Sequence, residues 1–183
     1  KHGDDHNTYE KHADHDEHDK SGKDGHLWLD PANAKVIVEN VSKILVEKYP
    51  DAGAKLQENA TKIAAKLDAL AAELETTLQP VKDKPFIVFH DATQYFENRF
   101  GLKAVGSITV SPDVQPSAKR LTAVRKQSGE LGAPCVVAEP GFQPKLLAAV
   151  TEGSNARSGT LDTEGATLPP SGEHYFELMR NLA

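Results

Sequence analysis

After Pro80 the sequence alternates short apolar runs with longer stretches of helical character. This alternation is typical of parallel strands, because the connecting helices cover both faces of the sheet and bury the strands between them. The sequence therefore predicts an α/β fold, a parallel sheet with flanking helices. We expect strands at 86–89, 105–110 and 135–138, and helices at about 93–100, 117–131, 143–152 and 172–182.

Before Pro80 the apolar residues recur at the spacing of an α-helix. Between residues 52 and 79 they are separated by steps of four and three, which predicts one continuous helix about 40 Å long. A shorter helix is expected to begin at Asp30-Pro31, an N-cap acceptor followed by proline, and to end at Tyr49-Pro50. The long helix suits a strut between two lobes, but an ordinary packed helix or a helical hairpin would show the same periodicity.

Residues 1–25 form a low-complexity segment rich in histidine and acidic residues. With little apolar surface to bury, this segment is expected to be a mobile loop. Imidazole groups on a flexible tether bind Zn²⁺, Cu²⁺ or Ni²⁺ weakly and exchangeably. The pattern predicts secondary weak metal sites, and a solvated acidic tail or the remnant of a purification tag is the alternative interpretation. The histidines concerned are His2, His6, His12, His15 and His18.

The charge of the chain is unevenly placed. Residues 1–19 contain seven acidic residues and only two lysines, so they hold most of the net charge of −6. The rest of the chain is nearly neutral and has no basic stripe to meet phosphates, which argues against nucleic acid as a partner. An acidic segment suits a cation instead.

Polar residues follow the predicted strands at their carboxyl ends, where the functional groups of parallel sheets gather. They are His90-Asp91, Pro112-Asp113 and Glu139-Pro140. A second candidate is His26, whose backbone would be fixed by the apolar residues and the capped helix start that follow it. Because an isolated histidine is more often part of a hydrogen-bonded structure, position alone makes metal binding a hypothesis only.

Enzyme motifs are missing from the sequence. It contains no Gly-x-Ser-x-Gly elbow, no His-Glu-x-x-His pair and no phosphate-binding loop. A zinc hydrolase needs three ligands, an open position and a carboxylate base. His26, His90, Asp162 and Glu139 could take those roles, so a zinc hydrolase remains as a minor alternative, and the protein is expected not to be an enzyme.

Taken together, these motifs resemble one family. The sequence is similar to the zinc-specific solute-binding proteins (ZnuA-type) of bacterial ABC importers, with matching motifs in the same order along nearly the whole chain. The motifs are the His/Asp-rich segment, His26-Leu27-Trp28-Leu29-Asp30-Pro31, the long helix, Phe89-His90-Asp91 with Tyr95-Phe96, Ala138-Glu139-Pro140 with Phe142-Gln143-Pro144, and Gly159-Thr160-Leu161-Asp162.

This resemblance implies two α/β lobes joined by one rigid helix, with the metal held between them. It implies that His26 is a metal ligand near the end of the first lobe and that His90 is a ligand from the second lobe. Asp162 lies where several family members supply a carboxylate. Manganese-importing relatives have a carboxylate in place of His90, so the imidazole favours zinc. The alternatives are a manganese- or iron-type binding protein or adhesin of the same family, and a periplasmic zinc buffer.

The resemblance also implies the cargo, the partners and the location. Zn²⁺ would be bound as cargo in the periplasm and passed to the ABC permease of a zinc importer. An accessory periplasmic zinc-binding protein is a second candidate partner, and the protein is expected to be a monomer. Most of the N-terminal lobe, with a further histidine ligand, is expected to precede Lys1. The implied divisions are a mobile loop (1–25), the end of the N-terminal lobe (26–50), a long linking helix (51–82) and a C-terminal α/β lobe (83–183).

Overall fold

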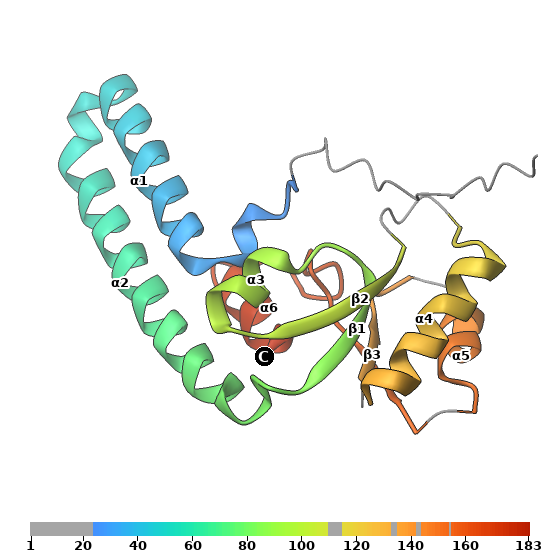
Figure 1. The fold of residues 1–183 in the computed structure, drawn as a ribbon. Coiled ribbons are helices and arrows are strands. Elements are labelled where there is room, and N and C mark those ends of the chain that lie inside the picture. The colour runs from blue at the N-terminus through green and yellow to red at the C-terminus, as the bar shows by residue number, and fades with distance from the viewer. Residues whose placement is uncertain (1–23, 110–114, 133–134, 142–143, 154) are drawn as a thin grey trace, which may run out of the picture.

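The computed structural model describes residues 24–109, 115–132, 135–141, 144–153 and 155–183. In Figure 1 a long helical hairpin projects from one side of an α/β unit. The predicted mobile loop and its five histidines lie outside the described residues, apart from Asp24 and Gly25. The prediction that these histidines bind metal weakly therefore stays a prediction.

Four strands form one parallel sheet in the order β2-β1-β3-β4. The central strand β1 pairs on both sides, with His90 opposite Thr109 and Val88 opposite Val137. The last four residues of β1 are buried, as expected for a strand covered on both faces of the sheet. The predicted parallel sheet is confirmed. Its strands are β1 (Pro85–His90), β2 (Lys103–Thr109), β3 (Cys135–Ala138) and β4 (Arg157–Thr160).

Strand β4 was not among the predicted strands. It lies at the edge of the sheet, where Ala138 pairs with Thr160, and all four of its residues are exposed. A strand without a buried side has no reason to alternate apolar and polar residues, so no periodic signal marks it in the sequence.

The helices agree with the predicted stretches to within about two residues. Asp30 caps the first helix: its carboxylate accepts the N–H of Ala32 at 2.8 Å, and Pro31 occupies the first helical position. None of the described helices has the length and apolar character of a membrane span. The helices are α1 (Pro31–Lys48), α2 (Gly53–Leu78), α3 (Gln94–Phe100), α4 (Ala118–Leu131), α5 (Pro144–Thr151) and α6 (His174–Leu182), with 3₁₀ turns η1 (Leu27–Leu29), η2 (Pro50–Ala52) and η3 (Gln79–Val81).

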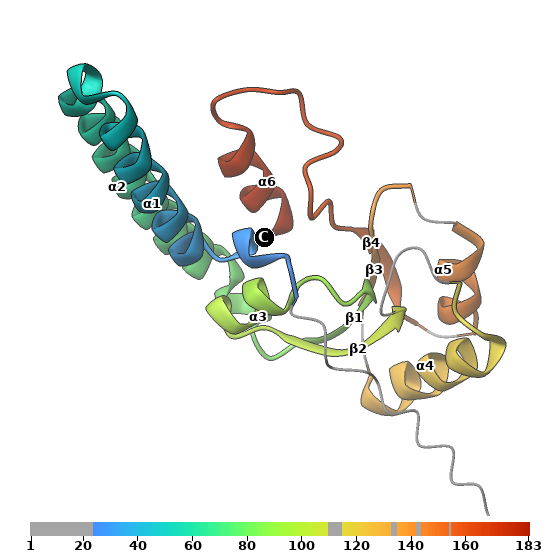
Figure 2. The same ribbon diagram turned by 90° about the horizontal axis from the view of Figure 1, so that it is seen from above.

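Two hydrophobic clusters lie on opposite faces of the sheet. Figure 2 shows α4 and α5 on one side and α3 and α6 on the other. The cluster beneath α4 and α5 includes Ile87, Ile108 and Val136. The other cluster joins Leu29 of η1 to α2, α3 and α6, and its most buried members include Leu70, Leu74, Phe100 and Met179. The apolar stripe of α2 therefore packs against the α/β unit over its second half.

Helix α1 carries a second apolar stripe that the described chain does not cover. Ile37, Val41 and Ile44 follow each other at helical spacing and are 41%, 48% and 53% exposed. A helix normally buries such a stripe against other polypeptide. One face of the hairpin is thus an unpartnered apolar surface within the described residues.

Candidate metal centre

The carboxyl ends of the parallel strands bring candidate residues to one edge of the sheet. His90 is the last residue of β1, Glu139 follows β3, and Asp162 follows β4 by two residues. Because neighbouring strands run in the same direction, these residues share one edge of the sheet. The sequence predicted this position for His90 and Glu139, whereas Asp162 follows β4, a strand that was not predicted. His90 is 9% exposed, so it is a buried polar group at this edge of the sheet.

His26 comes to the same edge from a different part of the chain. The turn that follows it is fixed by Leu29, which is fully buried, and by two long-range hydrogen bonds. The indole N–H of Trp28 donates to the carbonyl oxygen of Thr163 at 3.1 Å, and the hydroxyl of Tyr175 donates to the carbonyl oxygen of Trp28 at 2.8 Å. The apolar residues after His26 thus anchor it to the loop after β4 and to α6.

The structure places the rings of His26 and His90 side by side. Their centroids are 5.2 Å apart, and the ring planes are inclined at 73°. The ring of Trp28 lies 5.2 Å from the ring of His26 and forms a further wall of the site. Two histidines 64 positions apart in the sequence therefore meet, as the resemblance implied.

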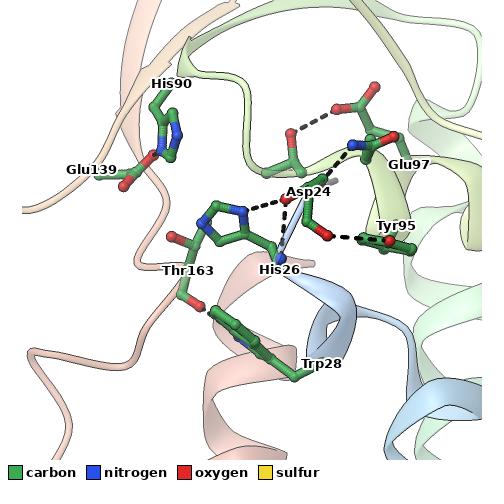
Figure 3. A network of polar contacts seen from close by, with 10 residues as sticks. Asp24, His26, Trp28, His90, Tyr95, Glu97, Glu139 and Thr163 are labelled. Carbon is green, nitrogen blue, oxygen red and sulfur yellow. Dashed lines mark hydrogen bonds and ion pairs between the residues drawn. The ribbon is translucent and has the colours of Figure 1, made fainter. Parts of the chain in front are cut away.

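Each imidazole has a carboxylate at its Nδ1 atom, as Figure 3 shows. The distance from His26 Nδ1 to Asp24 Oδ1 is 2.6 Å, and that from His90 Nδ1 to Glu139 Oε1 is 3.3 Å. Within the described residues, neither Nε2 atom has a hydrogen-bond partner. Each ring thus has one nitrogen held by a carboxylate and one nitrogen available to a ligand.

The carboxylates shift the proton affinities at the site. The hydrogen bond with Glu139 raises the pKa of His90 above its ordinary value; burial opposes this, and the charges of Glu139, Asp91 and Asp24 add to it. Burial raises the pKa of Asp24, but hydrogen bonds from His26 and Gln94 outweigh it, so the pKa of Asp24 is lowered overall. The negative charges of Asp24 and Glu139 beside the two rings favour a cation at the site.

Helix α3 holds Asp24 in place. Its first residue, Gln94, donates from Nε2 to Asp24 Oδ2 at 2.6 Å, and the hydroxyl of Tyr95 donates to the carbonyl oxygen of Asp24 at 3.3 Å. The backbone N–H of His26 also donates to Asp24 Oδ1, at 3.0 Å. The carboxylate that orients His26 is therefore fixed by residues about 70 positions away.

Asp162 is engaged by its own loop. Its carboxylate accepts hydrogen bonds from the N–H of Ala166 at 3.0 Å and from the N–H and hydroxyl of Thr167 at 2.8 and 2.7 Å. Burial raises the pKa of Asp162, but the hydrogen bonds lower it by more, so the net shift is downward. The structure thus shows Asp162 ordering the turn after β4, and its role as a metal ligand stays a prediction.

The described residues do not present a complete metal shell. No group of three or more His, Cys, Asp or Glu side chains among them is arranged around one ion. The chemistry available is that of two imidazole donors with supporting carboxylates.

The sequence predicted the position of Glu139 at the sheet edge correctly but gave no role to Asp24. The only feature of the sequence that could have indicated a role for Asp24 is its position two residues before His26.

The chain is similar to known zinc-uptake proteins. A family model described as "ZnuA: Zinc-uptake complex component A periplasmic" matches residues 2–183. The high-affinity zinc uptake system protein ZnuA of Brucella abortus (strain 2308) is 51% identical over 160 residues, which are 87% of this chain and 48% of that protein. The chain therefore spans about half the length of the curated relatives it matches.

Solved structures show the same fold. A mutant of the laminin-binding adhesin Lmb from Streptococcus agalactiae is 28% identical and superposes with a TM-score of 0.76, over 87% of this chain and 60% of that one. A crystal structure of ZnuA is 29% identical with a TM-score of 0.74, over 89% and 59% of the two chains. On the strength of the family match along nearly its whole length, this chain belongs to the ZnuA family of periplasmic zinc-uptake components.

Proposed function

We propose that this protein captures Zn²⁺ in the periplasm, with His26 and His90 as ligands, and delivers it to the permease of an ABC importer. The observation that carries the proposal is the ring pair. Two imidazoles that share a tetrahedral zinc through Zn–N bonds of about 2.0–2.1 Å have ring centroids roughly 5 Å apart. The separation of His26 and His90 is 5.2 Å.

The donor types support zinc over manganese. Imidazole nitrogen suits Zn²⁺, whereas Mn²⁺ prefers oxygen ligands. His90 offers nitrogen at the end of β1, and Glu139 lies at its Nδ1 atom, where it can orient the ring. A carrier must bind its cargo without turnover, and this donor set gives affinity without requiring a nucleophile or a general acid. The protein is accordingly a binding protein and not an enzyme.

The remaining donors and the second wall of the site come, in this proposal, from polypeptide that covers α1. A tetrahedral zinc needs about four donors, and the described residues offer two imidazoles in contact. The exposed stripe of Ile37, Val41 and Ile44 is a surface on which further chain can pack. Residues 26–50 then belong to a first lobe, 51–82 to the linking helix and 83–183 to the second lobe. Asp162 remains a candidate further ligand.

Delivery is the second part of the proposal. The relatives are named as parts of a high-affinity zinc uptake system, which supports an ABC permease as the partner of this protein. An accessory periplasmic zinc-binding protein is a further candidate partner, and the protein acts as a monomer. The histidines of the 1–25 segment supplement the main site with weak, exchangeable zinc binding.

A competition titration against a fluorescent zinc chelator tests capture. In the complete protein, His90→Ala should weaken zinc binding by more than the 10–100-fold typical of a lost outer partner. His174→Ala is the matched control, because His174 lies at the start of α6 and its Nδ1 is 3.3 Å from the Pro169 carbonyl oxygen. Equal effects, or a larger effect at His174, would overturn the site assignment.

A growth experiment tests delivery. Bacteria that lack their own periplasmic zinc-binding protein but keep the permease should grow under a zinc chelator when they express the complete protein. His90→Ala should fail to restore growth at equal protein levels. Full growth with His90→Ala would refute delivery from this site.

A further inference from the structure

We propose that Asp24 is the positioning residue of the site: it keeps the proton of the His26 imidazole on Nδ1 and so leaves Nε2 as the nitrogen that binds the metal. This inference rests on the proposed function, because it assigns a role to a residue that supports the proposed zinc ligand.

The Asp24 carboxylate contacts both His26 and Gln94. Oδ1 lies 2.6 Å from Nδ1 and 3.0 Å from the backbone nitrogen of His26, while Oδ2 accepts from Gln94 at 2.6 Å. The side chain of Asp24 is only 10% exposed. The carboxylate is therefore held from two sides and out of bulk water, so it cannot easily turn away from the ring.

The contact between Asp24 and the His26 ring determines which ring nitrogen carries the proton. An ionised carboxylate only accepts hydrogen bonds, so the 2.6 Å contact requires a proton on Nδ1. A neutral imidazole that carries its proton on Nδ1 has its lone pair on Nε2. Free histidine favours the other tautomer, with the proton on Nε2. Without Asp24, the ligating nitrogen of His26 would thus be protonated for much of the time and would have to change tautomer before binding.

The two histidines differ in how closely a carboxylate holds them. Glu139 lies 3.3 Å from His90 Nδ1, and its side chain is 17% exposed. This contact is therefore longer and more exposed to solvent than the contact between Asp24 and His26. Asp24 also has the support of α3 through Gln94 and Tyr95. Of the two rings, that of His26 is therefore held more firmly in one orientation. Helix α3 contributes to this through its hydrogen bonds to Asp24.

The test combines a tautomer measurement with a zinc affinity measurement on the complete protein. Nitrogen-15 NMR of the metal-free protein at about pH 8, well above the ordinary histidine pKa of about 6.5, reports which ring nitrogen carries the proton. The His26 signal is identified as the one missing from His26→Ala. We expect the Nδ1–H tautomer in the wild type and a shift towards Nε2–H in Asp24→Ala, with a roughly 10–100-fold loss of zinc affinity.

Further variants separate positioning from folding. Asp24→Asn keeps an oxygen acceptor and should lose less affinity than Asp24→Ala, and Gln94→Ala, which removes one support of the carboxylate, should lose less still. Asp51→Asn is the matched control, since Asp51 is exposed at the tip of the α1–α2 hairpin and should change neither readout. Circular dichroism checks that each variant is folded; if Asp24→Ala is not, Asp24→Asn and Gln94→Ala carry the test.

The outcomes distinguish this inference from the proposed function. An unchanged tautomer in Asp24→Ala, or a zinc affinity within about twofold of the wild type while His26→Ala binds weakly, refutes the role of Asp24 and leaves the site intact. If His26→Ala itself binds zinc as tightly as the wild type, the site assignment fails and the role of Asp24 falls with it.

Discussion

Leu29 is the buried anchor that fixes the turn after His26, and its removal should destabilise the protein far more than removal of its neighbour. Leu29 is fully buried in the cluster of α2, α3 and α6, whereas Leu27 in the same 3₁₀ turn is 40% exposed. The two leucines share sequence context and local conformation, so the pair Leu29→Ala and Leu27→Ala compares burial directly.

The magnitudes follow from burial. A leucine truncated to alanine in a packed core costs about 2.7–5.0 kcal/mol, because both transfer free energy and a cavity are involved. Truncating Leu27 to alanine leaves no enclosed cavity, because the side chain is partly exposed. Burying a whole leucine side chain is worth about 1.5–3 kcal/mol, so Leu27→Ala should cost roughly 1–2 kcal/mol. For a chain of this size, about 1 kcal/mol corresponds to about 2–4 °C in Tm. Leu29→Ala should therefore lower Tm by roughly 5–20 °C.

Urea and thermal unfolding of the metal-free chain, followed by circular dichroism, measure both variants. Because Leu29 fixes the segment that carries His26, Leu29→Ala should also weaken zinc binding, whereas Leu27→Ala should leave it nearly unchanged. Equal losses of stability for the two variants would refute the assignment of Leu29 as the anchor.

Three further predictions address the rest of the chain. Deleting residues 1–19 should remove several weak equivalents of zinc in calorimetry and leave the strong site unchanged; an unchanged stoichiometry would contradict the proposed role of the histidine-rich segment. Burial, with the charge of Asp91, raises the pKa of Glu97 above its ordinary value of 4.5 despite hydrogen bonds from Thr93 and Ala104. The protonated form stabilises the fold below pH 4.5, and this contribution is lost as the pH rises through the raised pKa. Between pH 4.5 and 7, Glu97→Gln should therefore lose less unfolding free energy than the wild type. Parallel plots of unfolding free energy against pH for the two proteins would contradict this prediction. Finally, this chain without residues 1–19 should bind zinc at least about 100-fold more weakly than the complete protein from which the same residues are removed. Matching affinities would place the whole site within residues 20–183.

Much of the fold was predictable because its elements obey simple periodicities. The apolar runs of β1 and β3 and the stripe of α2 each have a buried side, and burial leaves a pattern in the sequence. The exposed edge strand β4 left no such pattern and was missed. The stripe on α1 has helical spacing, but its exposure could not be predicted, because periodicity indicates an apolar face without indicating what covers it.

The candidate site was predictable only in part for a related reason. His90 lies at the end of an apolar strand, where the functional groups of parallel sheets gather, so the sequence could mark it as a candidate. The role of Asp24 is seen only from its contacts with His26 and with Gln94, which is 70 positions away in the sequence. Likewise, no sequence pattern indicates that both oxygens of Asp162 are engaged by the backbone of its own loop. Such roles depend on tertiary contacts, which a single sequence does not display.

X-ray absorption spectroscopy at the zinc edge tests the central claim that His26 and His90 bind one zinc ion. The complete protein, with residues 1–19 deleted so that their histidines do not contribute, is loaded with one equivalent of Zn²⁺. The wild type should show nitrogen ligands at about 2.0–2.1 Å with outer-shell scattering from at least two imidazoles. His26→Ala and His90→Ala should each lose one imidazole, and His174→Ala should lose none. An imidazole count that stays unchanged in both His26→Ala and His90→Ala would contradict the account.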